Sequence, residues 1–384
     1  MKYAVRGLGL AVSLSLVSTV ALTPHASAQS TTAANVYVQI QGTAGSVYGF
    51  HASSTGKLTA ISSAAWKPTG QIIGSNKTQF ITLGEDNIHS YAVESNGAIG
   101  AALEQNPYTD YPGGNCGAGS TADNIAVLDH TGKFVYIVLQ TSNEISGCAA
   151  VQSFNINSAG AFDAVGETVL NGSYLTLPSI LGNESFAYAN DNSSGTIGFT
   201  RESSGALEPL QVHETDPTLS GGSYLSGLPD ASPAGNYVAL TLLNTVQDTT
   251  QLGSYTVDPE GNLTTTNTSS NMPTTALVVT GSTFSPSGNM YVLYGENGNY
   301  SNGQQVPGGI EIYNFNGAAP LTLNTKLLTG TSINQVAWDK SNHLYAINGA
   351  AGKVHVYTVT TTSVEEAAGS PYSVGATGLV VAGP

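Results

Sequence analysis

Short runs of alternating apolar and polar residues, separated by glycine-rich turns, recur along the whole chain. In residues 285 to 298, SPSGNMYVLYGENG, a Ser-Pro-x-Gly turn leads into an apolar, aromatic run that stops at a second glycine-rich turn. The run has the length and period-two pattern of a β-strand. Comparable runs occur seven times, about fifty residues apart, with the marker aromatics Tyr37, Phe80, Tyr136, Tyr188, Tyr237, Tyr291 and Tyr345. The chain is therefore built from a repeat.

Each marker strand is followed by a second strand with its own aromatic residue. These residues are Phe50, Tyr91, Phe154, Phe199, Tyr255, Tyr313 and Tyr357. Eight positions further on, six of the seven units have an apolar residue, namely Leu58, Ile99, Phe162, Leu207, Leu263 and Leu321. In the seventh unit, Val364 falls one position short. A glycine stands two positions before the apolar residue in the first five units, as expected of a tight turn between antiparallel strands.

Two further segments complete each unit. A turn such as DHTGK or SPAGN precedes the marker strand, and an apolar strand such as NIAVL precedes the turn. Seven units of four short strands predict an all-β fold, a seven-bladed β-propeller with antiparallel blades. The first unit lacks its inner strand, whereas the chain ends with the strand ATGLVVA, which no blade follows. We therefore expect the C-terminal strand to complete the first blade and close the ring.

The N-terminus has the pattern of a secretory signal peptide. Lys2 and Arg6 precede an apolar stretch at residues 7–22, and a small-residue cleavage site, Ala26-Ser27-Ala28, follows it. We expect residues 1–28 to be removed, so that residues 29–384 form a single propeller domain in the periplasm or outside the cell. No later segment is long and apolar enough to cross a bilayer, so membrane insertion is not expected.

Composition and charge narrow the classes of partner. Charged residues make up 9% of the chain, hydrophobic residues 40%, and the formal net charge at pH 7 is −15. Such a charge repels phosphate backbones, so nucleic acid is not an expected partner. We expect a monomer whose partner is a small-molecule or carbohydrate-type ligand, or a protein bound at the mouth of the propeller channel.

Two cysteines, Cys116 and Cys148, are present. In an oxidising compartment an even pair predicts one disulfide that closes a loop. A metal site or a reactive thiol would need a histidine or a second cysteine pair nearby, and neither cysteine has one in the sequence.

The repeat pattern SPxGxxxYV…(I/V)xxYxVxxxGxL resembles that of the YVTN and 6-phosphogluconolactonase-like lactonase group of seven-bladed propellers. The resemblance covers the chain from about Asn35 to Ala382. It implies hydrolysis of sugar lactones or opening of related rings by His, Arg and Glu residues at the channel mouth. At the matching positions this chain has Ala122-Asp123 in place of Pro-His, Leu177-Pro178 in place of Arg-His, and residues 190–192, Asn-Asp-Asn, in place of Glu.

The expected function is therefore ligand or partner binding at the channel mouth, without the family's catalytic His and Arg residues. One alternative is a lactone hydrolase that acts on sugar lactones with a relocated catalytic group. The best catalytic cluster for it is His213 with Glu214 and Asp216, because a histidine beside carboxylates can serve as a general base. The other reading of this cluster is a solvated loop. The second alternative function is an interaction scaffold in the cell envelope.

Ligand-binding candidates lie near the predicted channel and in the disulfide loop. Asp123, Asp191 and Asp230 are the acidic candidates, and Tyr108 and Tyr111 are aromatic residues that either stack on a sugar ring or peptide or pack on blade three. Acids in the loops between the middle strands suit Ca²⁺, namely Glu85, Asp86, Glu144, Asp191, Asp248 and Glu296. No Asp-x-Asp-x-Asp-Gly loop accompanies them, so neither a metal nor a cofactor is predicted.

Overall fold

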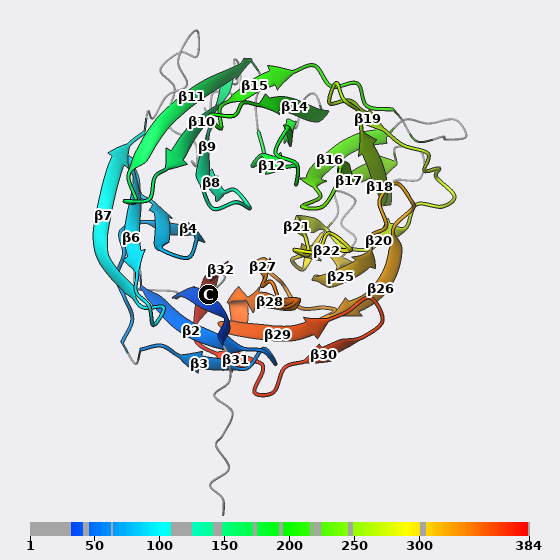
Figure 1. Ribbon diagram of the computed structural model, residues 1–384. Coiled ribbons are helices and arrows are strands. Elements are labelled where there is room, and N and C mark those ends of the chain that lie inside the picture. Colours follow the sequence, from blue (N-terminus) through cyan, green and yellow to red (C-terminus); the bar gives the residue numbers. More distant parts are fainter. Residues whose placement is uncertain are drawn as a thin grey trace, which may run out of the picture. The chain divides into compact units, whose positions relative to one another are not determined.

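The computed structural model describes residues 32–40, 46–62, 64–108, 125–140, 148–171, 175–191, 195–215, 217, 224–244, 249–299 and 305–382. They form seven antiparallel sheets, each built on a path of four hydrogen-bonded strands. The sheets follow one another as the blades of a ring, and one edge strand of each sheet lies nearest the axis (Figure 1). The predicted all-β fold, a seven-bladed β-propeller, is confirmed. Residues 1–28 lie outside the described residues, so the signal peptide and the domain boundary at residue 29 stay predictions.

The inner two strands of each blade come from the apolar strand and the marker strand. The innermost strands of blades one to seven are β32 (Ala376–Ala382), β4 (Gln71–Ser75), β8 (Ile125–Leu128), β12 (Ser179–Ile180), β16 (Tyr224–Ala231), β21 (Val279–Phe284) and β27 (Gln335–Trp338). The second strands are β1 (Thr32–Ile40), β5 (Gln79–Leu83), β9 (Phe134–Gln140), β13 (Phe186–Asp191), β17 (Tyr237–Asn244), β22 (Met290–Gly295) and β28 (His343–Asn348).

The outer two strands contain the second aromatic and the apolar residue that follows it. The third strands are β2 (Val47–Ser53), β6 (Asn87–Val93), β10 (Cys148–Ile156), β14 (Gly195–Arg201), β18 (Thr249–Val257), β25 (Gly309–Asn314) and β29 (Lys353–Val359). The outermost strands are β3 (Leu58–Ala60), β7 (Ile99–Pro107), β11 (Phe162–Asn171), β15 (Leu207–Leu210), β19 (Leu263–Thr264), β26 (Thr322–Leu327) and β30 (Val364–Glu366).

A few short elements supplement the blades. The strands β20 (Thr274–Thr275) and β31 (Tyr372–Ser373) extend blades five and seven, and β23 (Gly298–Asn299) pairs with β24 (Gln305–Val306) in a separate hairpin. The 3₁₀ turn η1 (Gly349–Ala351) is the one helical segment among the described residues. Within the part of the chain that the structure describes, no helix has the length and apolarity that a membrane span requires.

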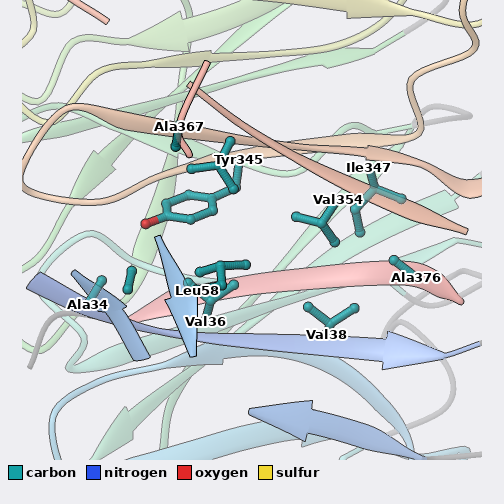
Figure 2. Close-up of a cluster of buried hydrophobic side chains, with 11 residues drawn as sticks. Ala34, Val36, Val38, Leu58, Tyr345, Ile347, Val354, Ala367 and Ala376 are labelled. Atoms are coloured by element: carbon teal, nitrogen blue, oxygen red, sulfur yellow. The ribbon is translucent and has the colours of Figure 1, made fainter. Parts of the chain in front are cut away.

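The ring closes through the C-terminal strand, as predicted. Strand β32 pairs antiparallel with β1, where Tyr37 lies opposite Val380. The junction with blade seven is an apolar cluster, in which Ala34, Val36 and Val38 of β1 face Tyr345 and Ile347 of β28 (Figure 2). All five of these side chains are fully buried. The first and last segments of the propeller are therefore held together by both a strand ladder and hydrophobic packing.

The glycines of the outer turns are required by the backbone. Gly97, Gly205 and Gly261 have φ angles of +76°, +94° and +88°, in the left-handed region. Their carbonyls accept hydrogen bonds from marker tyrosines of the preceding blades, such as Tyr136 to Gly205 at 3.1 Å and Tyr188 to Gly261 at 2.9 Å. A Cβ atom on Gly205 would lie 2.2 Å from the ring of Phe134. The glycine at this position of the repeat is therefore needed both for the conformation of the outer turn and for the close contact with the preceding blade.

The marker aromatics do not all occupy one position, and this corrects the sequence alignment. Tyr136 lies opposite Ser153, whereas Tyr291 lies opposite Tyr313 and Tyr237 lies opposite Thr256. Relative to the aromatic residue of the third strand, Tyr136 lies opposite the residue before it, Tyr291 lies opposite the aromatic residue itself, and Tyr237 lies opposite the residue after it. Because successive residues of a strand point to opposite faces, Tyr291 points to the other face of its blade from Tyr136. The aromatic is present in every copy, but the turn before it sets the face on which it lies.

Candidate ligand site at the propeller axis

A cavity of about 370 Å³ lies at the axis of the propeller, against the inner strands of blades three to six. We call it the axial cavity. It is lined by Val127 to His130, Leu177 to Ile180, Asp230, Ala231, Pro233 and Ser282 to Phe284. These residues lie on β8, β12, β16 and β21 or directly beside these strands in the chain. The volume is in the range of small-molecule sites in proteins.

The wall of the axial cavity combines apolar surfaces with hydroxyl groups. Leu177 and Phe284 supply apolar surface, and Ser179, Ser282 and Thr283 supply hydroxyls. Ser179 also accepts a hydrogen bond from the backbone N–H of Ala231 at 2.8 Å, which ties blade four to blade five beside the cavity. Such a lining can pack against the carbon skeleton of a ligand while it orients the ligand's polar groups.

Asp230 is the acidic group of this wall that lacks a partner. It lies on the innermost strand β16, and its Oδ2 is buried without a hydrogen-bond partner. Burial raises the pKa of the Asp230 carboxyl, although Ser282 and Tyr291 of blade six face it and partly offset that effect. Neither residue forms a well-aligned hydrogen bond to Oδ2. A buried acid in this state favours its protonated form.

Two tyrosines of β22 surround Asp230 from the side of blade six. Burial, together with the charge of Asp230, raises the pKa of Tyr294 to about 12 and that of Tyr291 well above its ordinary value. Both phenols therefore stay protonated and uncharged at neutral pH. The Tyr291 hydroxyl is also buried without a hydrogen-bond partner.

Asp129, the second carboxylate of the lining, is fully engaged. Its Oδ1 accepts hydrogen bonds from the backbone N–H groups of Lys133 and Phe134, each at 3.0 Å. Its Oδ2 accepts a hydrogen bond from Thr131 and lies 3.5 Å from the guanidinium of Arg201. Arg201 in turn donates to Glu184 at 2.8 Å. Asp129 is therefore a turn and inter-blade residue rather than a free acid.

Comparison with solved structures gives the same architecture. The chain matches a candidate 6-phosphogluconolactonase from Bacteroides uniformis ATCC 8492 with a TM-score of 0.60 and 15% identity, over 91% of this chain and 100% of that one. A candidate 6-phosphogluconolactonase from Bacteroides fragilis NCTC 9343 matches with a TM-score of 0.59 and 15% identity, over 91% and 97%. The shared fold is the seven-bladed β-propeller.

A third structure and two further searches complete the comparison. The periplasmic gluconolactonase PpgL of Pseudomonas aeruginosa matches this chain with a TM-score of 0.56 and 13% identity, over 91% of this chain and 98% of that one. No protein-family model matches the chain, and no curated protein matches it in sequence. At such identities the likeness concerns the fold alone.

Of the residues proposed as a catalytic cluster, His213 and Glu214 lie at the outer edge of the propeller. His213 is exposed, its carbonyl accepts a hydrogen bond from Leu263 N–H of β19, and Glu214 forms a parallel bridge with Leu263. Strand β19 is the outermost strand of blade five, whereas Asp230 lies on the innermost one. The structure therefore separates His213 from Asp230, and Asp216 lies outside the described residues.

The other predicted ligand residues are only partly covered by the structure. Tyr108 is buried in the core beside β6, and its hydroxyl lies 2.9 Å from the Gly84 carbonyl and 2.5 Å from that of Glu85. Its ring packs against residues of blade three, which is the second of the two roles considered for it. Asp191 ends β13 and is buried beside Leu175. Asp123, Tyr111 and Cys116 lie outside the described residues, as does the side chain of Cys148, so the disulfide stays a prediction.

The acids considered for Ca²⁺ are not brought together. Glu85 and Asp86 lie in the β5–β6 loop of blade two, Asp191 in blade four, and Glu296 after β22 in blade six, where its side chain pairs with Asn334. Glu144 and Asp248 lie outside the described residues. Among the residues that are described, no group of three or more His, Cys, Asp or Glu side chains is placed to hold a metal ion.

The residues that surround Asp230 were not identified from the sequence, although one signal was available. Counted from the turn that follows the inner strand, the residues equivalent to Asp230 are Gly74, Val127, Ser179, Thr283 and Ala337. Asp230 is the charged member of this set. An acid at an otherwise neutral inner-strand position would have indicated the axial cavity.

Proposed function

We propose that the protein is an exported, ligand-binding propeller that takes a small, hydroxyl-bearing molecule of carbohydrate type into the axial cavity. The observation that carries the proposal is the cavity itself, in which Asp230 is a buried acid without a partner. Ser179, Ser282 and Thr283 would exchange hydrogen bonds with ligand hydroxyls, while Leu177 and Phe284 would cover the C–H faces of a sugar ring.

The signal-peptide pattern supports export, and the net charge of −15 favours a ligand that is not anionic. A phosphorylated sugar fits this surface poorly. A monomer agrees with a site built within one ring, because the cavity lining comes from a single chain.

Lactone hydrolysis at the same cavity is the second candidate. The fold similarity to a gluconolactonase from Pseudomonas aeruginosa favours it. A carboxylate with a raised pKa is suited to take a proton from a water molecule that attacks a lactone carbonyl, so Asp230 would be the base in this case.

Calorimetric titration of the exported protein, with Gln29 expected as its first residue, tests both candidates. We expect saturable heats with neutral sugars or D-glucono-1,5-lactone, and loss of binding in Thr283→Phe, which fills the cavity. Ser203→Phe, on an exposed outer turn, is the matched control. Proton release from the lactone above the buffer rate, lost in Asp230→Asn, would favour hydrolysis. Absence of binding and of turnover with every probe would contradict the proposed function.

A further inference from the structure

The Asp230 carboxyl lacks the partner that a buried charge requires. A carboxylate removed from water without a compensating cation or hydrogen bonds is strongly unfavourable, and proteins pair or protonate such groups. The residue is half-buried as a whole because it lines the axial cavity, but its Oδ2 is inaccessible and without a hydrogen bond. The missing partner must therefore be a proton or a group that enters from the cavity.

No cation of the surrounding elements fills this role. Ser282 on β21 and the phenols of Tyr291 and Tyr294 on β22 face Asp230, and all three are uncharged. The other strands packed against β16 are β12, β13, β14 and β17. Their charged residues are Asp191 at the far end of β13 and Arg201 on β14. Arg201 is committed to Asp129 and Glu184, at 3.5 and 2.8 Å.

The electrostatic surroundings of the cavity suit a cation in one further respect. Its described lining contains no lysine or arginine, its one histidine is His130 in the turn after β8, and the protein carries a formal net charge of −15, which raises the local concentration of cations. A divalent metal ion is a poor occupant, because Ca²⁺ takes six to eight oxygen ligands and Asp129 is already engaged.

We propose that the axial cavity selects small organic cations whose primary ammonium group pairs with Asp230. This rests on the proposed function and names its ligand class: an amino sugar or a comparable amino alcohol. The ammonium group would pair with the Asp230 carboxylate on the side that is accessible from the cavity, and the hydroxyls of the same ligand would reach Ser179, Ser282 and Thr283. The ionised carboxylate then has a charged partner, and the ligand supplies it.

Binding of such a ligand is coupled to the loss of a proton. In the empty cavity the burial of Asp230 favours the neutral acid, whereas the bound ammonium group stabilises the carboxylate. The proton leaves Oδ1 or Oδ2 for the buffer as the ammonium group enters. Affinity should therefore rise with pH from acid conditions towards neutrality, until the ligand's own ammonium group begins to deprotonate.

The test is calorimetric titration of the exported protein with D-glucosamine and with D-glucose, at pH 5 and at pH 6.5, where the glucosamine ammonium group stays protonated. At pH 6.5 each titration is run in two buffers of different ionisation enthalpy. We expect glucosamine to bind about tenfold or more tightly than glucose at pH 6.5, with net release of protons to the buffer, and this preference to shrink at pH 5. Asp230→Asn should abolish the preference and the proton release. Asp163→Asn, an exposed residue on the outermost strand β11, should keep both.

The outcomes separate this inference from the proposed function. Equal binding of the two sugars, or a glucosamine preference that survives in Asp230→Asn, would overturn the ammonium site and leave sugar binding intact. Absence of heat with both sugars would overturn the two together. Loss of the preference in Asp163→Asn as well as in Asp230→Asn would trace it to the overall charge and would also overturn the ammonium site.

Discussion

The turn before β28 and the inner strand β16 each bury an aspartate, and the two environments are opposite. In the turn, Asp339 Oδ1 accepts hydrogen bonds from Ser341 N–H and His343 N–H, at 2.8 and 2.9 Å. Its Oδ2 accepts one from the Tyr345 hydroxyl at 2.9 Å and lies 2.7 Å from His343 Nδ1. On β16, Asp230 Oδ2 has no hydrogen bond.

Their acidities follow from these surroundings. Burial alone would raise the pKa of Asp339, but hydrogen bonds from the side chain and backbone of His343 and from Tyr345 lower it below its ordinary value. For Asp230, burial dominates and its pKa is raised. The comparison teaches that burial by itself does not show what an acid does. A satisfied acid holds the structure together, whereas an unsatisfied one can accept a partner.

The largest predicted effect is the loss of stability when Asp339 is replaced by asparagine. Asp339→Asn places an amide among four donors, so we expect the free energy of unfolding at pH 7 to fall by about 3 kcal/mol. Because the pKa of Asp339 is lowered in the folded state, its contribution is present above the unfolded pKa of about 4 and is lost as pH falls further. Urea unfolding measures both, with Asp163→Asn as the exposed control. A loss below about 0.5 kcal/mol, which is typical of surface changes, would contradict the prediction.

The same substitution at Asp230 should have the opposite sign. A raised folded pKa means that the native state holds its proton more tightly, so Asp230 costs stability as pH rises above about 4. Asp230→Asn removes that cost, and we expect the free energy of unfolding at pH 7.5 to rise by about 1–2 kcal/mol. Urea unfolding at pH 4 and pH 7.5 should show the gain at the higher pH alone. A destabilised variant at pH 7.5 would mean that the empty site already supplies a partner for the carboxylate.

The smallest effect extends the comparison to two tyrosines. The Tyr188 hydroxyl donates to the Gly261 carbonyl at 2.9 Å, whereas the buried Tyr291 hydroxyl has no hydrogen-bond partner. We expect Tyr188→Phe to lower the free energy of unfolding by about 1 kcal/mol, and Tyr291→Phe to leave it within about 0.5 kcal/mol or raise it. Thermal unfolding of both variants checks this. Equal losses would show that the phenol of Tyr291 is as well bonded as that of Tyr188.

The repeat made the fold predictable because propeller blades are encoded locally. The number of blades was predicted from the alternation of apolar and polar residues and from the outer-turn glycines, which are short-range patterns. The ring closure was predicted from the unmatched strand at the C-terminus. The register of the marker aromatics was not predicted, because Tyr237 and Tyr291 follow similar turns but stand one position apart. A one-residue shift moves a side chain to the other face and leaves the pattern of apolar residues almost unchanged.

The candidate site was less predictable because it depends on contacts between blades. Asp230 was identified as an acid near the channel, but Ser282 and Tyr291 reach it from a different blade, and no local pattern links them. Proximity in sequence was misleading for His213, which is close to Asp230 along the chain and lies at the opposite edge of blade five. Tyr108 was likewise interpreted as an aromatic residue of the disulfide loop, although it packs in the core.

The pairing of β1 with β32 makes the first blade dependent on a segment that is synthesised after the other six blades. Until residue 376 has emerged, β1 presents an unpaired edge, and the cluster of Figure 2 lacks Ala376. A polypeptide interrupted at any earlier point keeps that edge open, where proteases and chaperones recognise unfinished strands. The circular arrangement thus works as a check on translation of the whole propeller, since only a chain translated through β32 can cover the edge of β1.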